Sequence, residues 1–234
     1  MTSSPKSRYS KHVALKFDQD GKVLEFPGST VICHVPTDSP THAFLIRLRD
    51  CIKTQPWASK YSFLPPSSYH MTVFDVVCDQ FRTPAHWTSR LPLDAPLEDV
   101  DRLLIEQWQN IDRPATFSVS CQRFYVRDVI GISLSPTSSE VEREMRNYRD
   151  ILSQAFGVRY PNHAYYGFHI TLAYHIKRLS QFDSLQAQCF VLQNRRSIQK
   201  EFGLLQFDSP ELTFFADMTH FAHRRKDAIR HRQD

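Results

Sequence analysis

Two segments of the chain alternate apolar and polar residues in the same way. Residues 69–74 read Tyr-His-Met-Thr-Val-Phe, and residues 168–173 read Phe-His-Ile-Thr-Leu-Ala. Successive side chains of a β-strand point to opposite faces, so each histidine shares a face with the threonine two residues later. The apolar residues between them fill the other face. Both segments therefore predict a strand with an apolar back and a front that carries an imidazole and a hydroxyl.

The rest of the pattern predicts a helix ahead of each of these two strands. Strands are expected over 29–35, over 69–78, over 116–124 with 128–134 as a hairpin, over 165–175 and over 211–218. Helices are expected over 40–55, 97–108 and 139–156, with a further one within 180–194. The order predicts an α+β fold that is bilobal, a pseudo-twofold repeat of antiparallel sheet plus helices around a central cleft.

The chain divides into one large unit with two polar ends. Residues 1–28 are polar with turn signals and predict a weakly ordered N-terminal arm. Residues 29–218 form the single bilobal domain. Residues 219–234 are expected to be a basic, solvated C-terminal tail, and we attribute His220 and His223 to its composition rather than to a metal site.

Composition narrows the class of protein. Hydrophobic residues make up 41% and charged residues 23%, as in soluble globular proteins, and no apolar run approaches the length of a membrane span. The five cysteines are scattered singly, which favours a reducing cytoplasmic or nuclear setting. The net charge of +4 is compatible with an anionic ligand.

The two motifs suggest acid–base chemistry on a phosphate. Histidine titrates near neutrality, so His70 and His169 can act as a base and an acid at the same pH. The hydroxyls of Thr72 and Thr171 can donate hydrogen bonds to the oxygens of a phosphoryl group. A third triplet, His86-Trp87-Thr88, lies between prolines and lacks a strand pattern, so we assign it to a loop.

Other residues near the motifs are weaker candidates. Tyr69, Phe74 and Phe168 could stack on a nucleobase, although core packing is the commoner role of such rings. Arg127, at the expected hairpin tip, could reach a phosphate, and His34 could point into the cleft from the first strand.

The paired motifs resemble the two-histidine (2H) phosphoesterase superfamily, whose members carry one His-x-Thr/Ser motif in each of two similar lobes. The run Pro-Pro-x-x-Tyr-His-Met-Thr-Val-Phe-Asp at 65–75 is also similar to a subfamily described as RNA ligase or cyclic nucleotide phosphodiesterase-like. The resemblance covers about residues 29–218. It implies a bilobal antiparallel fold, no metal or other cofactor, and cleavage of cyclic phosphates on RNA ends or nucleotides.

These observations predict a metal-independent cyclic phosphodiesterase. Its expected ligand is a cyclic nucleotide or a cyclic-phosphate-ended RNA, with no membrane and no obligate protein partner. Two alternatives remain open: a nucleotide-binding or RNA-end-binding module without turnover, and an exonuclease that trims RNA 3′ ends with the same four residues. The sequence does not decide which histidine is the base.

Overall fold

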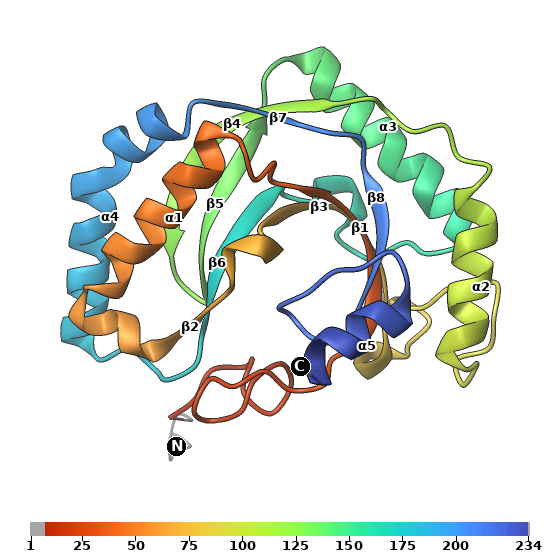
Figure 1. Ribbon diagram of the computed structural model, residues 1–234, viewed down its shortest axis with the longest axis horizontal. Coiled ribbons are helices and arrows are strands. Elements are labelled where there is room, and N and C mark those ends of the chain that lie inside the picture. The colour runs from red at the N-terminus through yellow and green to blue at the C-terminus, as the bar shows by residue number, and fades with distance from the viewer. Residues whose placement is uncertain (1–7, 234) are drawn as a thin grey trace, which may run out of the picture.

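The computed structural model describes residues 8–233, with side chains up to residue 230, and folds them around one antiparallel sheet (Figure 1). The strands follow the order β7-β4-β5-β6-β3-β1-β8, and β2 pairs with β6 beside this path. Their bounds are β1 Gly28–His34, β2 Tyr61–Phe63, β3 His70–Cys78, β4 Phe117–Val126, β5 Val129–Pro136, β6 His169–His175, β7 Leu204–Phe207 and β8 Glu211–Phe215. The α+β class and the antiparallel sheet are therefore confirmed.

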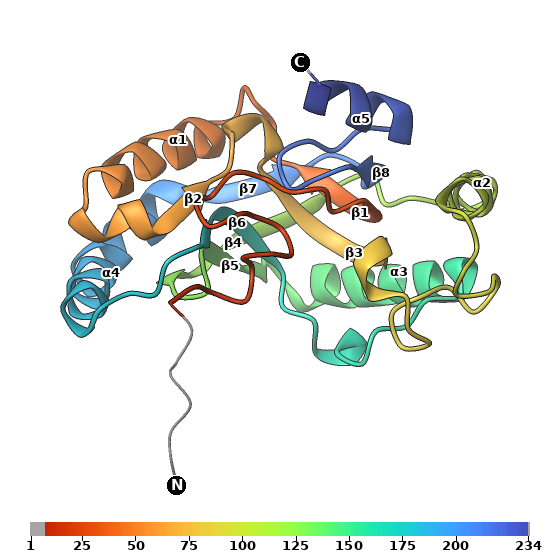
Figure 2. The ribbon, with the colours of Figure 1, turned by 90° about the horizontal axis from the view of Figure 1, so that it is seen from below.

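Five α-helices among the described residues surround the sheet (Figures 1 and 2). They are α1 Pro40–Lys53, α2 Leu97–Trp108, α3 Ser139–Phe156, α4 Gln181–Phe202 and α5 Arg225–Gln233. Side-chain caps mark the start of three of them: the Ser39 and Ser138 side chains accept from the backbone N–H of the third residue of α1 and α3, and Ser180 forms a capping box with Asp183 at the start of α4. Gly157 ends α3 in the left-handed conformation.

The two motif strands, β3 and β6, are neighbours at the middle of the sheet. One antiparallel pair, Met71 with Ile170, joins them. The register about that pair sets His70 beside Thr171 and Thr72 beside His169. The two halves of the sheet therefore meet along one short seam, and the front faces of both motifs lie on the same side of it.

Each motif strand carries a β-bulge directly after its threonine. Thr72 of β3 pairs with Ile32 of β1, and Phe74 pairs with the neighbouring Val31. Val73, between Thr72 and Phe74, is therefore left unpaired. On β6 the same shift leaves Leu172 unpaired, between the partners of Ile130 and Gly131. A bulge inserts one residue and changes which face the following side chains occupy. Over the first six residues of each strand, starting at the histidine, buried and partly exposed side chains consequently follow the same order. The two halves therefore repeat each other even in the position of the bulge.

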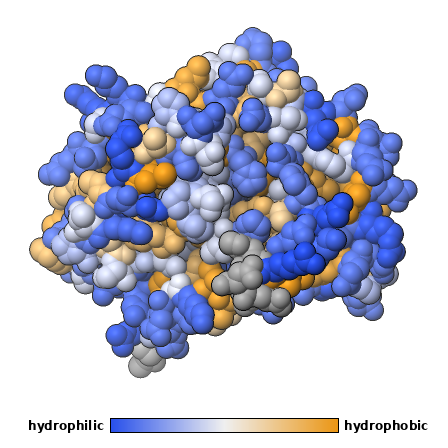
Figure 3. Space-filling model, viewed as in Figure 1, coloured by the Kyte–Doolittle hydropathy of each residue, from blue (hydrophilic) through white to orange (hydrophobic). Residues whose placement is uncertain are grey.

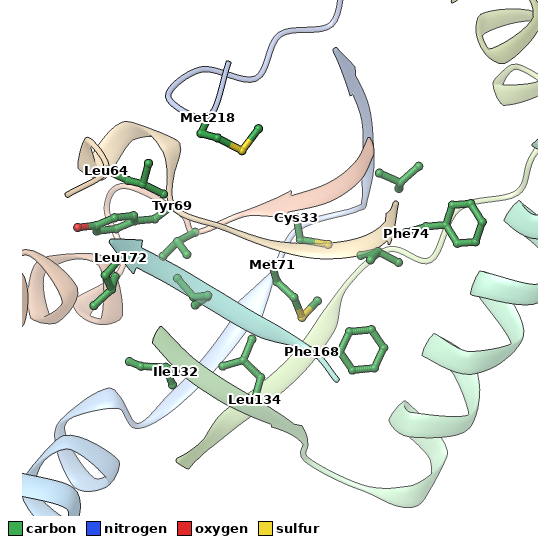
Figure 4. Close-up of a cluster of buried hydrophobic side chains, with 14 of the residues drawn as sticks. Cys33, Leu64, Tyr69, Met71, Phe74, Ile132, Leu134, Phe168, Leu172 and Met218 are labelled. Carbon is green, nitrogen blue, oxygen red and sulfur yellow. The ribbon is translucent and has the colours of Figure 1, made fainter. Parts of the chain in front are cut away.

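The other side of the motif strands is the hydrophobic core. Met71 and Ile170 are completely buried, and Figure 4 shows Met71 among Ile132, Leu134 and Phe168 behind the strands. Helix α3 closes this core next to β3, where Phe156 lies near Phe74. The fully buried backs fix the register of both strands, because a slip of one residue would expose every core side chain.

Both ends of the described chain pack against the domain, in contrast to the predicted arm and tail. Phe17 and Phe26, within the predicted arm, are buried in the core, and the Ser10 amide donates to the Ile176 carbonyl at 2.9 Å. At the other end, the Arg225 guanidinium pairs with Asp101, with its Nε 2.6 Å from a carboxylate oxygen. Residues 1–7 of the expected arm lie outside the described residues.

The surface is mainly hydrophilic on the face drawn in Figure 3, with smaller hydrophobic areas between. All five cysteines are free. Within residues 8–233 no helix combines the length and apolar character needed to cross a bilayer.

Candidate active site

All four motif side chains line one cavity of about 410 Å³. His70 and Thr72 come from β3, and His169 and Thr171 come from β6. The antiparallel seam and the apolar backs of the two strands hold these four side chains on one face. The structure thus brings together the four residues that the sequence singles out.

The two histidines are held in the same way. Nδ1 of His70 lies 2.7 Å from the Ser68 carbonyl, and Nδ1 of His169 lies 2.9 Å from the Gly167 carbonyl, in each case two residues back along the chain. A carbonyl only accepts, so Nδ1 carries the hydrogen and Nε2 is the free nitrogen of each neutral ring. A short 3₁₀ turn precedes each motif strand, Pro66–Ser68 and His163–Tyr165.

His70 lies in the more enclosed environment. The Phe221 ring contacts it edge-on with ring centres 4.3 Å apart. Burial lowers the pKa of His70 to about 4, and the neighbouring His34 and His169 lower it further, against the opposing effect of the Ser68 carbonyl. His70 is therefore neutral at physiological pH, the state that a general base needs.

Behind Thr72 lies a hydrogen-bonded group that the sequence analysis did not find. Hydrogen bonds link the Tyr166 hydroxyl to the Asp75 carboxyl and to Thr72. Burial raises the pKa of Asp75, against the opposing effect of His169, Arg149 and Lys16. Asp75 lines the cavity because the bulge at Val73 turns it to the front of β3.

Arg149 of α3 packs against this group. Its guanidinium donates to the carbonyls of Val73, the bulged residue, and His163, and it stacks over the Tyr166 ring at 4.3 Å. The side chain is only 3% exposed, so these backbone partners satisfy most of a buried cation. Arg149 thereby fixes the backbone that aims Asp75 into the cavity.

Lys16 supplies a cation to the same cavity. Its ammonium lies 4.7 Å from the centre of the Phe26 ring and 5.1 Å from that of Tyr174, and it forms no ion pair with the described residues. Tyr174 occupies on β6 the place that Asp75 has on β3, two residues beyond the bulge. Lys16 belongs to the segment predicted as a weakly ordered arm, and no periodic signal marks it.

The remaining predicted residues lie in different places. Tyr69 and Phe74 are each 1% exposed and pack in the core, so neither reaches the cavity as a stacking platform. Phe74 points toward α3 because the bulge reverses its side of the strand (Figure 4). His34 pairs with His70 across β1 and β3 and is half-buried outside the cavity lining, and burial lowers its pKa. Arg127 lines a second groove, next to His169. Phe168 borders the same groove but is 3% exposed and packs in the core, so it is no stacking platform either.

No cluster of three metal-ligating side chains occurs among the side chains of residues 8–230. The chemistry available to the described cavity is that of two imidazoles with free Nε2 atoms, two threonine hydroxyls, a carboxyl and an ammonium. Such a set can transfer protons and bind an anion.

Comparison with protein families gives one match. The family model "2H-phosphodiest: Domain of unknown function (DUF1868)" matches residues 16–129, which include the first motif and Lys16. The second motif lies outside the matched range. A comparison with curated protein sequences found no match.

Several solved structures are similar to this chain. The conserved protein of unknown function ATU0111 from Agrobacterium tumefaciens is 29% identical, with a TM-score of 0.86 over 93% of this chain and 92% of that one. LigT from E. coli in its apo form is 11% identical, with a TM-score of 0.46 over 85% and 95% of the two chains. TT0787 of Thermus thermophilus is 14% identical, with a TM-score of 0.39 over 80% and 85%.

The likeness to ATU0111 extends over nearly the whole of both chains, and the family match names the two-histidine class that the motifs resemble. This match supports an activity in phosphodiester hydrolysis or a ligase-like reaction, without identifying the substrate. Over residues 16–129 the chain matches the 2H-phosphodiesterase family model, which confirms the resemblance that the motifs suggested.

Proposed function

We propose that this protein hydrolyses cyclic phosphodiesters, 2′,3′-cyclic nucleotides or the 2′,3′-cyclic phosphate ends of RNA, by two-histidine acid–base catalysis. The observation that carries the proposal is the shared geometry of the two motifs. Both imidazoles have Nδ1 fixed on a backbone carbonyl, and both line the same cavity as the two threonines.

Each residue has a defined task in this reaction. Nε2 of His70, neutral because of its lowered pKa, accepts a proton from the attacking water. The oxygen of that water bonds to phosphorus as the bond to the 2′ or 3′ oxygen breaks, and His169 in its protonated form gives its Nε2 proton to that leaving oxygen. Thr72 and Thr171 donate hydrogen bonds to the non-bridging oxygens, where negative charge develops. His70 ends protonated and His169 neutral, and proton exchange with solvent restores both.

The position of the seam suits an in-line displacement. His70 and His169 lie on opposite sides of the central pair, Met71 with Ile170, so a phosphate held over that pair has one imidazole on each side. The entering and leaving oxygens of an in-line reaction also lie on opposite sides of phosphorus. Lys16 adds a positive charge to the cavity that receives the anion.

The test is hydrolysis of 2′,3′-cyclic AMP in EDTA by the wild type and by His70→Ala and His169→Ala. Each change should reduce kcat by about 10²–10⁴-fold, because each removes one proton-transfer group. His86→Ala is the matched control, since it alters the third His-x-Thr triplet, outside the cavity lining, and should retain turnover.

The product, a 2′- or 3′-phosphate, identifies the oxygen that leaves. A folded wild type that turns over neither this nucleotide nor an RNA with a cyclic phosphate end would refute the proposal and leave a binding module as the better explanation. Full activity in either motif variant would refute the two-histidine mechanism.

A further inference from the structure

A second groove adjoins the cavity at His169. It has a volume of about 380 Å³ and is lined by residues of β4 and β5, by Arg127 of the turn between them, and by Gly167, Phe168 and His169. His169 therefore lines both spaces, and the groove continues the front of the sheet away from the catalytic seam.

Strand pairing places two rows of side chains on this front. Arg123 of β4 pairs with Ser133 of β5, which pairs with His169 of β6. In the next row, Tyr125 pairs with Gly131, which pairs with Thr171. Directly paired residues share a face, so the face of the motif runs across three strands to Arg123 and Tyr125, roughly 10 Å from β6 at two strand spacings.

Contacts on the back of β4 confirm this orientation. Phe124, between Arg123 and Tyr125, is buried and lies 6.2 Å from the Phe190 ring of α4. Helix α4 thus covers the back of β4, and the residues on either side of Phe124 face the groove.

The groove carries positive charge that the protein does not neutralise. Arg123 and Arg127 are exposed, and neither forms an ion pair with the side chains of residues 8–230. Asp128 follows Arg127 but pairs with Lys11, its Oδ2 2.7 Å from the ammonium. Both arginines therefore remain available to an anionic ligand in the groove.

An aromatic ring lies between the two arginines. The Tyr125 hydroxyl fills the space that a side chain at residue 131 would need, since a Cβ on Gly131 would lie 2.8 Å from it. Burial raises the pKa of Tyr125, against the opposing effect of Arg123 and Arg127, both near its hydroxyl. Alternation of cationic side chains with an aromatic ring is the pattern that binds single-stranded nucleic acid, through phosphates and stacked bases.

The His70 side of the cavity has different surroundings. There the C-terminal segment forms two hydrogen bonds between Phe214 and Ala222 and places Phe221 over His70. Phe221 therefore covers the cavity beside His70, whereas beside His169 the cavity adjoins a basic groove.

Resting on the proposed function, we propose that this groove binds the strand of a single-stranded RNA whose terminal 2′,3′-cyclic phosphate occupies the cavity. The preferred substrate is then an RNA end rather than a free cyclic mononucleotide. RNA is the class concerned because a 2′,3′-cyclic phosphate requires a 2′-hydroxyl. Arg123 and Arg127 would bind backbone phosphates, and Tyr125 would contact a sugar or base next to the terminal residue.

The experiment compares two substrates and one product. kcat/KM is measured for a short single-stranded RNA with a cyclic phosphate end and for 2′,3′-cyclic AMP. Anisotropy measures binding of the same RNA, with the 2′- or 3′-phosphate that the reaction leaves, at several salt concentrations. The double variant Arg123→Gln/Arg127→Gln should lower the ratio of the two kcat/KM values, RNA over mononucleotide, by about tenfold or more. It should also reduce the slope of log Kd against log salt by about 0.7 for each arginine that contacts a phosphate.

The control is Arg113→Gln/Arg143→Gln, which removes the same charge from a different groove, one that also carries Asp112, Glu140 and Glu144. It should leave the ratio and the salt slope at their wild-type values. The inference would be overturned if the wild type had the same kcat/KM for 2′,3′-cyclic AMP and for the RNA, or if the Arg123/Arg127 variant kept the wild-type ratio and salt slope. The proposed function would stand in either case. RNA binding that depends on the two arginines in a protein that hydrolyses neither substrate would support the groove and refute the proposed function.

Discussion

Phe221, from outside the motif, contributes to the burial of His70. Its ring covers one side of the imidazole, and burial is the largest cause of the lowered His70 pKa. A base with a pKa of about 4 is neutral over the whole physiological range but is intrinsically weak. The burial to which Phe221 contributes therefore makes His70 a weaker base, but it keeps the imidazole neutral at physiological pH.

The fall of activity at low pH should reveal the lowered pKa of His70. Because His70 must be neutral to accept a proton, kcat/KM for 2′,3′-cyclic AMP should fall only as the pH drops toward about 4. Phe221→Ala admits water and raises the pKa of His70 toward 6.5, so the midpoint of that fall should move up by at least about one pH unit. A profile that does not move in Phe221→Ala would show that His70 is not the group titrating there.

The threonines give a second prediction for single residues. Thr72→Val and Thr171→Val keep the shape of each side chain but remove one donor to the phosphoryl oxygens. If these hydrogen bonds strengthen in the transition state, each change should lower kcat by about 10²–10³-fold with a much smaller change in KM. Equal changes in kcat/KM and KM at constant kcat would assign the hydroxyls to ground-state binding alone.

Residue-level patterns predicted the motif and little around it. His70, Thr72, His169 and Thr171 were identifiable because alternation on a strand is a local property. Lys16 and Tyr166 reach the cavity through long-range packing, which no local pattern encodes. Asp75 belongs to the run at residues 65–75 that resembles the family. The face of β3 on which it lies depends on the bulge at Val73, and that bulge is defined only by the pairing of β3 with β1.

Among the elements, the bulged strands define the shape of the site. A regular β3 would place Phe74 at the front and Asp75 in the core, whereas the bulge does the reverse. The bulge on β6 similarly brings Tyr174 to the cavity. The helix and strand order was predictable from periodicity and caps, but β2, with three residues, and β7, with four, are too short to show a period.

Arg149 should be essential to the first bulge. Arg149→Met removes the donor to the Val73 and His163 carbonyls while filling similar space, and each buried carbonyl left without a partner costs about 1–3 kcal/mol. The free energy of unfolding in urea should fall by roughly 2–4 kcal/mol, with a loss of turnover at temperatures where the variant is folded.

Arg159→Met is the matched control for this change. Arg159 pairs with Asp150 at 3.0 Å, but its side chain is 59% exposed, so its loss should cost under about 1 kcal/mol. Equal stability of the two variants would contradict the assigned role of Arg149.

For the whole molecule, the sheet unites what the repeat pattern suggested as two lobes. The antiparallel α+β architecture and the helix before each motif were predictable, since each half repeats the same order. The packing of both chain ends was not predictable, because their polar composition resembles that of solvated segments. Phe17 and the Arg225–Asp101 pair are the contacts that tie these ends to the domain.

Stability should fall in mild acid because several histidines are kept neutral by burial. Burial lowers the pKa of His12 and of His70 to about 4, and lowers those of His34, His163 and His175. Below about pH 6.5 the unfolded chain binds protons at these residues before the folded protein does, and at His12 and His70 the folded protein does so only near pH 4. The free energy of unfolding should therefore decrease as the pH falls through this window, by up to about 3 kcal/mol for each of His12 and His70.

Urea unfolding at several pH values between about 7.5 and 4.5 measures this decrease. The raised pKa of Asp75 acts in the opposite direction, because the folded state takes up that proton first. His70→Gln should flatten the pH dependence relative to the wild type, and an unchanged slope would contradict the burial of a neutral His70.

The cavity takes one wall from Lys16, near the beginning of the described chain, and another from Phe221, near its end. Every strand of the sheet lies within residues 28–215, so a chain cut after residue 216 would keep all the strands but lose the wall that carries Phe221. His70 would then be open to water, and its pKa would lie nearer its ordinary value. The closed site therefore depends on the segment that follows the last strand, whereas the sheet itself does not.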